Sequence, residues 1–119
     1  MIVDPHTHTT VSSGCSRMAP EELVSAALAR GLDAIAVTEH MRIEGAEVTR
    51  ALGASQGLLV LRGIEVYTSD GDMLVYGVYE DFEPWDSAIE LARWVHDQGG
   101  IVVAAHPHRG GFGLGAIMR

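Results

Sequence analysis

Five of the six histidines in this 119-residue chain stand where a predicted β-strand ends. His6 and His8 follow the opening strand, His40 follows the second, and His106 and His108 follow the last. Neutral imidazole is a common metal ligand, and the carboxyl ends of parallel strands meet at one rim of an α/β fold. The placement of these histidines therefore predicts a metal site.

The pair His6-x-His8 presents two imidazoles on the same side of an extended backbone, because side chains in a strand repeat every second residue. Two exposed loop histidines are the simpler interpretation of such a pair taken alone. However, His40, Glu65 and His106 each end a different apolar strand, where polar side chains without partners would cost free energy. Their convergence on one rim favours shared coordination of Zn, Mn or Fe.

Short apolar runs alternate with amphipathic segments along the chain, which is typical of an α/β architecture with right-handed crossovers. The pattern predicts strands over residues 1–3, 33–38, 58–65, 73–79 and 101–105, and helices over 20–30, 46–52 and 84–98. Turn-forming residues at 69–72 predict that the third and fourth strands pair as an antiparallel hairpin.

The composition indicates one domain over residues 1–119, because 47% hydrophobic residues suffice for a single core. Acidic residues outnumber basic ones 16 to 8, and the net charge of −8 opposes a nucleic-acid partner. The single cysteine, Cys15, cannot form an intramolecular disulfide. We expect a cytoplasmic protein with no membrane partner, since the sequence shows neither an export leader nor an apolar run of about 18 residues.

Five short motifs follow one another in the chain: DPHTHT at 4–9, VTEH at 37–40, GIEV at 63–66, DGDML at 70–74 and AHP at 105–107. In this order and spacing they make the sequence similar to the PHP family, the polymerase and histidinol phosphatase domain. The resemblance covers nearly the entire chain. It implies a partial, distorted TIM-like (β/α)7 barrel, of which about five strands are present, and the hydrolysis of phosphate esters.

By position, the resemblance also implies the metal ligands. His6 and His8 bind one ion, Glu65 bridges that ion to a second, His106 binds the second, and His40 serves a third. Up to three divalent ions, of Zn, Mn or Fe, are thus implied. Clustered divalent ions activate water and clamp phosphate oxygens, so no protein nucleophile is needed. We expect a phosphoesterase that hydrolyses a small phosphorylated metabolite or a nucleotide.

The sequence departs from the family pattern at several positions. Asp72 stands where many members carry histidine, and we expect it to be a ligand rather than a solvated turn residue, because carboxylates also bind these metals. Where the family often supplies another ligand after His8, the chain has Ser13 and Gly14. Cys15 nearby could bind a soft metal as thiolate, but a small half-buried cysteine is the favoured interpretation.

The family's C-terminal Asp-x-His pair has no counterpart in this sequence, so we expect a C-terminally incomplete domain. A TIM-class barrel needs about 200 residues or more. We therefore expect the open side of the sheet to be covered either by a longer parent chain or by a second copy, as in a homo-oligomer.

Several other residues are candidates for supporting roles. Arg17 and Arg109 are candidates for holding a substrate phosphate, with ordinary surface arginines as the alternative. His108 is expected to support the site without binding metal. Asp4 and Glu39, next to ligand histidines, are expected to orient their imidazoles.

Two other functions stay open from the sequence. One is a metal-binding but catalytically silent structural or regulatory module, which would hold metal without hydrolysing phosphate esters. The other is a 3′–5′ exonuclease, which would share the same motifs although the net charge of −8 opposes it. The glycines within 110–115 lack the strand-turn-helix order of a phosphate-binding loop.

Overall fold

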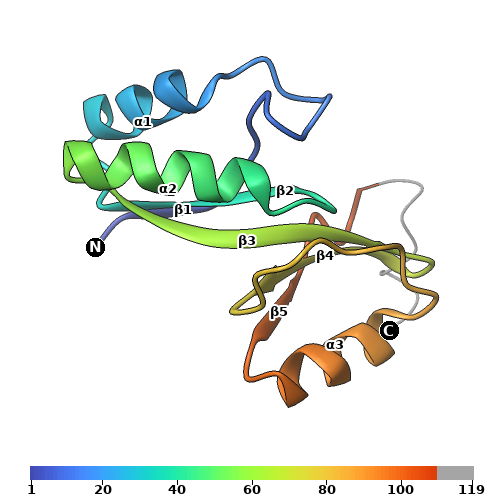
Figure 1. Cartoon of the computed structure of the whole chain (residues 1–119). Helices are drawn as coiled ribbons and strands as arrows, with labels where there is room; N and C mark the ends of the chain where they lie inside the picture. Colours follow the sequence, from blue (N-terminus) through green and yellow to red (C-terminus); the bar gives the residue numbers. More distant parts are fainter. Residues whose placement is uncertain (110–119) are drawn as a thin grey trace.

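A computed structural model describes residues 1–109, and Figure 1 shows their arrangement. The described elements are β1 (Val3–Thr7), α1 (Pro20–Ala29), β2 (Ala34–His40), α2 (Glu44–Gln56), β3 (Leu59–Thr68), β4 (Gly71–Tyr76), α3 (Ala88–Asp97) and β5 (Ile101–Ala104). The glycine-rich stretch at 110–115 lies outside the described residues. No helix within residues 1–109 is both long and apolar enough to cross a bilayer.

The strands form one sheet in the order β1-β2-β3-β4-β5. β1, β2 and β3 run parallel, whereas β4 pairs antiparallel with both β3 and β5. The predicted hairpin between the third and fourth strands is thus confirmed. Because β4 runs in the opposite direction, its first residues lie at the edge of the sheet where the other strands end.

The strand boundaries differ from the predicted ones, and the differences in β1 and β4 bear on the site. β1 continues through Pro5 to Thr7 instead of ending at Val3, because β1 is an edge strand and an edge tolerates the missing N–H of proline. β4 begins at Gly71, so Asp72 is a paired strand residue and not part of the turn. The structure therefore places Asp72 in the sheet.

Among the helices, α2 and α3 differ most from their predicted ranges. α3 begins at Ala88 instead of Pro84, since the Ser87 side chain caps the helix by accepting a backbone N–H of the first turn at 3.4 Å. α2 extends beyond the predicted 46–52 and ends where Gly57 takes a left-handed φ of 81°.

The helices cover one face of the sheet. Val60, Ile64 and Val66 share that face of β3 by the two-residue period of a strand. Val60 packs in a core cluster with residues of α1 and α2, whereas Ile64 and Val66 pack in a second cluster with Leu91 and Val95 of α3. The two clusters hold the strands in place below the edge at which β1, β2, β3 and β5 end.

The opposite face carries apolar side chains that no helix within residues 1–109 covers. Leu61 of β3 is 42% exposed, and Ile101 and Val103 of β5 are 60% and 48% exposed. Across this face the Tyr76 hydroxyl of β4 donates a hydrogen bond to the Pro5 carbonyl of β1, past two intervening strands. The sheet is therefore strongly curled, like part of a barrel, with this apolar face on its concave side.

Candidate metal centre

All six predicted metal ligands line one cleft of about 420 Å³ at the carboxyl ends of β1, β2 and β5. They are His6 in β1, His8 just after it, His40 in β2, Glu65 in β3, Asp72 in β4 and His106 after β5. Asp72 reaches this edge because β4 runs antiparallel to its neighbours. Cys15, Tyr67 and Arg109 complete the lining.

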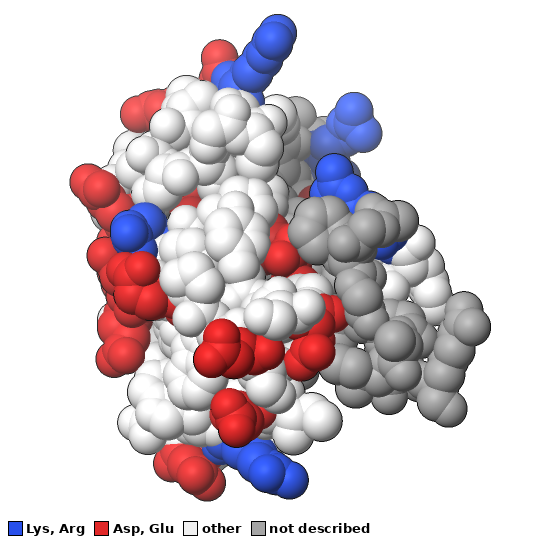
Figure 2. Space-filling view, turned by 90° about the vertical axis from the view of Figure 1, so that its right-hand side faces the viewer, with Lys and Arg blue, Asp and Glu red and all other residues white. Residues whose placement is uncertain are grey.

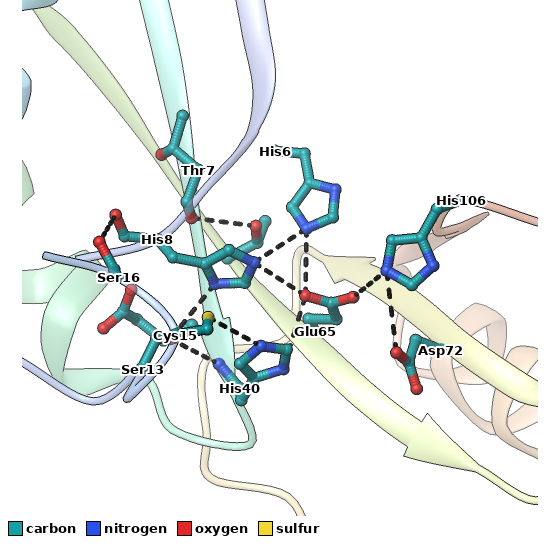
Figure 3. Close-up of polar contacts among 12 residues, drawn as sticks. His6, Thr7, His8, Ser13, Cys15, Ser16, His40, Glu65, Asp72 and His106 are labelled. Carbon is teal, nitrogen blue, oxygen red and sulfur yellow. Dashed lines mark hydrogen bonds and ion pairs between the residues drawn. The ribbon is translucent and has the colours of Figure 1, made fainter. Parts of the chain in front are cut away.

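Glu65 lies at the centre of the cluster and is 1% exposed (Figure 3). Its Oε2 atom lies 3.0 Å from His6 Nε2, 2.9 Å from His8 Nε2 and 3.5 Å from His40 Nδ1. Its Oε1 atom lies 2.9 Å from His106 Nε2 on the other side. The two oxygens of this carboxylate thus face different histidines, which is the arrangement that a bridge between two ions requires.

The electrostatics of the cluster follow from this packing. Burial alone would raise the pKa of Glu65, but hydrogen bonds with His6 and His8 hold that pKa well below its usual range. The hydrogen bond with Glu65 in turn raises the pKa of His6, whereas burial lowers the pKa of His40. Burial, followed by the charge of Glu65, raises the pKa of Asp72.

Three overlapping groups of ligand atoms occur among the described residues. They are His6, His8 and Glu65; Glu65, Asp72 and His106; and His8, Cys15 and His40, and within each group the ligand atoms lie within 4.8 Å of one another. Glu65 belongs to the first two groups and His8 to the first and third. Groups that share members in this way suit a cluster of neighbouring ions.

The donor set fits divalent metals. Imidazole nitrogens and carboxylate oxygens are the ligands of Zn, Mn and Fe sites. In addition, His40 Nδ1 is buried and makes no hydrogen bond, and its nearest charged neighbour is Glu65 Oε2 at 3.5 Å. A buried nitrogen without a hydrogen bond costs free energy, and coordination would remove that cost.

Cys15 is exposed, whereas the sequence favoured a half-buried cysteine. Its Sγ atom lies 3.4 Å from His40 Nε2 (Figure 3). The loop that follows β1 folds back over the end of β2 and directs the thiol into the cleft. The sequence pattern could not show this because the two residues are 25 positions apart.

Glu39 does not orient an imidazole, contrary to the prediction. Its carboxylate is fully buried and accepts hydrogen bonds from the Thr9 N–H, the Thr9 hydroxyl at 3.0 Å and the Ser12 N–H at 2.8 Å. Gly45 of α2 packs so closely that an added Cβ would lie 2.6 Å from a Glu39 carboxylate oxygen. Glu39 therefore fixes the loop that carries His8 and Cys15.

Sequence reasoning missed the roles of Ser13 and Tyr67. The buried Ser13 hydroxyl lies 3.2 Å from His8 Nδ1 and accepts the His40 N–H at 3.2 Å, so it orients the ring of His8, a candidate ligand. The Tyr67 ring stacks on the His40 ring with centroids 5.2 Å apart. Its position two residues after Glu65, on the same face of β3, was the available signal.

The remaining candidates differ in their distance from the cleft. Arg109 lines it, whereas the exposed Arg17 and His108 are not among the lining residues. Asp4 accepts the backbone N–H of His6 at 3.2 Å, so it supports the strand and not the His6 ring. Arg109 is therefore the better placed of the two arginines for contact with a bound anion.

Two non-glycine residues with positive φ also lie at this edge. Met41, directly after His40, has a φ of 63°, and His106 has a φ of 30°. Such conformations are uncommon and concentrate at functional sites, where the surrounding structure holds them. The backbone thus turns sharply at one candidate ligand, His106, and directly after another, His40.

Comparison with known proteins agrees with this architecture. The sequence profile of the PHP domain family matches residues 4–107, and the chain therefore belongs to this family. It is 34% identical over 129 aligned positions to a PolC-type DNA polymerase III of Oceanobacillus iheyensis, covering 89% of this chain and 9% of the polymerase. It is 37% identical over 70 residues to a phosphoribosyl 1,2-cyclic phosphate 1,2-diphosphodiesterase of Eggerthella lenta, covering 59% and 26%.

Among solved structures, an amidohydrolase from Chromobacterium violaceum aligns with a TM-score of 0.75 at 17% identity, covering 98% of this chain and 71% of that one. This likeness confirms the predicted TIM-like barrel fold, of which residues 1–109 form a curled, five-stranded part. The chain spans about half or less of the length of the curated relatives it matches.

Proposed function

We propose that this chain is a divalent-metal-dependent phosphoesterase that acts on a small phosphorylated metabolite or a nucleotide. The observation that carries the proposal is the buried Glu65 carboxylate, whose Oε2 faces His6 and His8 and whose Oε1 faces His106. Asp72 Oδ2 lies 3.8 Å from His106 Nε2 and extends the second side. Membership of the PHP family, whose relatives here include a phosphodiesterase, supports the reaction class.

The roles of the residues follow from their chemistry. Divalent ions in such a cluster supply an activated water and neutralise phosphate oxygens. His6, His8 and Glu65 would hold one ion, and Glu65, Asp72 and His106 would hold another. Glu65 stays ionised because its pKa is held low, so it offers negative charge to both groups. Arg109, at the rim, would bind a phosphate oxygen of the substrate.

Size and charge support a small substrate. The cleft of about 420 Å³ suits a small molecule, and Arg109 is the only Lys or Arg among the described residues that line it. Figure 2 shows Asp and Glu side chains over the face turned toward the viewer, with Lys and Arg mostly near its edges. With a net charge of −8, this surface offers little attraction to a long phosphate backbone.

A 3′–5′ exonuclease is the second candidate, because the chain is 34% identical to a PolC-type polymerase over 89% of its own length. The charge of the molecule opposes it. Release of mononucleotides from single-stranded DNA, at a rate above hydrolysis of small phosphate esters, would favour this candidate over the first.

The test combines metal analysis with hydrolysis. Protein purified without chelators is expected to contain stoichiometric Zn, Mn or Fe and to hydrolyse chromogenic phosphomonoesters or phosphodiesters. The variant His8→Ala is expected to lose this activity, whereas His96→Ala, on the exposed side of α3, is expected to retain it.

Two outcomes would contradict the proposal. Absence of bound metal, with added metal binding no tighter than roughly millimolar, would exclude a metal-dependent enzyme. Stoichiometric metal without hydrolysis of any phosphate ester would instead support the catalytically silent module.

A further inference from the structure

The group formed by His8, Cys15 and His40 contains the one thiol of the chain and lies at the opposite end of the cleft from Asp72. We propose that Cys15 is a metal ligand and that, with His40 and His8, it forms a site selective for a thiophilic ion such as Zn²⁺. The inference deepens the proposed function and rests on it only in sharing the same cleft.

The distances place the thiol among ligand atoms. Cys15 Sγ lies 3.4 Å from His40 Nε2, and one ligand atom of His8 lies within 4.8 Å of both. Two atoms that bind one ion at about 2.0–2.3 Å lie at most about 4.6 Å apart, so the 3.4 Å between Cys15 Sγ and His40 Nε2 suits shared coordination. Cys15 would bind as the thiolate, and its proton would pass to the solvent.

The loop that presents Cys15 is fixed on both sides of the thiol. Ser13 bonds to the His40 N–H, and the Ser16 hydroxyl donates to the His8 carbonyl at 3.0 Å. The Ser16 N–H also bonds to the Ser13 carbonyl at 3.1 Å, which closes a tight turn around Cys15. The position of the thiol thus results from several contacts, which is the condition for a precise ligand.

The His40 ring is held with similar firmness. It stacks on the His8 ring at 4.5 Å between centroids and on the Tyr67 ring at 5.2 Å. Tilting the His40 ring out of its plane would break both stacking contacts. The ring therefore offers one nitrogen to the thiol side and the other to Glu65, from which it is 3.5 Å away.

The two ends of the cleft differ in ligand chemistry. Thiolate with imidazole favours Zn²⁺ and other soft ions, whereas a carboxylate-rich group such as Glu65, Asp72 and His106 also accepts Mn²⁺. The protein is therefore expected to bind Zn²⁺ at the Cys15 end even where Mn²⁺ is offered in excess.

The test uses Co²⁺ as a probe of the whole chain, kept reduced with a reductant that contains no thiol. Titration is expected to produce a thiolate-to-cobalt charge-transfer absorption that saturates with one equivalent. In Cys15→Ser this band is expected to vanish, and Zn²⁺ affinity is expected to fall by more than the roughly 10–100-fold that loss of a merely orienting residue costs. His96→Ala is the control and is expected to keep the band.

A rescue variant separates coordination from packing. Cys15→His is expected to restore Zn²⁺ affinity without the charge-transfer band, because imidazole replaces the thiolate as a ligand. Since Cys15 is exposed, these substitutions are expected to leave the thermal unfolding midpoint of the metal-free protein unchanged.

The outcomes distinguish this inference from the proposed function. If cobalt binds and phosphate esters are hydrolysed but no thiolate band appears, Cys15 forms only a hydrogen bond with His40 and this inference is wrong. If the band appears without any hydrolysis, Cys15 is a ligand and the phosphoesterase proposal is wrong.

Discussion

Glu65 is the residue on which the candidate centre depends, because its two oxygens lie within 3.5 Å of four histidine rings. It is nearly fully buried, yet its neighbours keep it ionised. A buried carboxylate among imidazoles supplies the negative charge that bound divalent cations need, while the imidazoles supply neutral ligand atoms. The chemistry of the cleft is thus concentrated in one side chain of β3.

Replacing Glu65 with glutamine is expected to weaken metal binding at both groups that contain it, by at least about 100-fold, because a ligand contributes more than a residue that only orients one. Calorimetric titration with Mn²⁺ and Zn²⁺ measures this change. Glu83→Gln is the matched control, since that side chain is 85% exposed. Equal affinities in the two variants would show that Glu65 is not a ligand.

The metal-free protein is expected to show different pKa values for His6 and His40. The hydrogen bond with Glu65 raises the pKa of His6 above its usual 6.5, and burial lowers the pKa of His40. A proton on His6 competes with a metal ion, so metal affinity is expected to rise as the pH increases through the raised pKa of His6.

The stability of the metal-free fold has the opposite dependence on His6. The contribution of protonated His6 is fully present below about pH 6.5 and is lost as the pH rises through its raised pKa. NMR titration of the imidazole signals measures the pKa values of His6 and His40. A pKa of His6 equal to or below that of His40 would contradict this prediction.

At the scale of elements, the loop between β1 and α1 depends on β2 and α2 for its position. Glu39 of β2 holds Thr9 and Ser12 of this loop, and Gly45 of α2 leaves room for the Glu39 carboxylate. The helix, the strand and the loop therefore meet at one buried charge. Any change that moves this charge is expected to move the Cys15 side of the cleft.

The variant Gly45→Ala tests this dependence. Its Cβ would lie 2.6 Å from a Glu39 carboxylate oxygen, and overpacking of this kind costs about 1–3 kcal/mol of folding free energy. Urea denaturation is expected to show that loss. Gly14→Ala is the control, because an added Cβ there meets nothing within 4 Å. A Gly45→Ala protein as stable as Gly14→Ala would contradict the close packing.

The sequence was sufficient to predict the main strands, because β2 and β5 are short apolar runs and such runs are local signals. It also predicted which ligand candidates meet, since strand ends share an edge. It could not predict that Glu39 holds Thr9, 30 residues away, or that Cys15 faces His40. Those contacts depend on how the loop folds over β2, which no local pattern encodes.

At the scale of the whole molecule, the concave face is the main apolar surface that helices leave open within residues 1–109. Leu61, Ile101 and Val103 are each at least 42% exposed there. Exposed apolar patches of this kind commonly mark an interface. Covering of this face by a second copy or by further chain stays a prediction, and light scattering of the purified 119-residue chain would reveal association between copies.

The open face is expected to bind an environment-sensitive apolar dye. The double variant Leu61→Gln, Val103→Gln is expected to lower dye fluorescence, because both side chains line the apolar cleft of about 500 Å³. Ile89→Gln, on the exposed side of α3, is the control and is expected to leave the signal unchanged. An equal loss of fluorescence in both proteins would show that the dye binds elsewhere.

The hairpin between β3 and β4 determines how the candidate metal centre would tolerate insertions. Tyr67 pairs with Asp72 and Glu65 with Leu74, so these side chains share the concave face through the parity of the register. If one residue were inserted between Tyr67 and Asp72 and the tight turn kept its length, the pairing of β4 with β3 would shift by one position. Asp72 would then point toward the helices. Two added residues would restore the parity. Whether Asp72 faces Glu65 and the histidines therefore depends on whether the number of residues between Tyr67 and Asp72 is even or odd, although that connecting segment contains no candidate ligand.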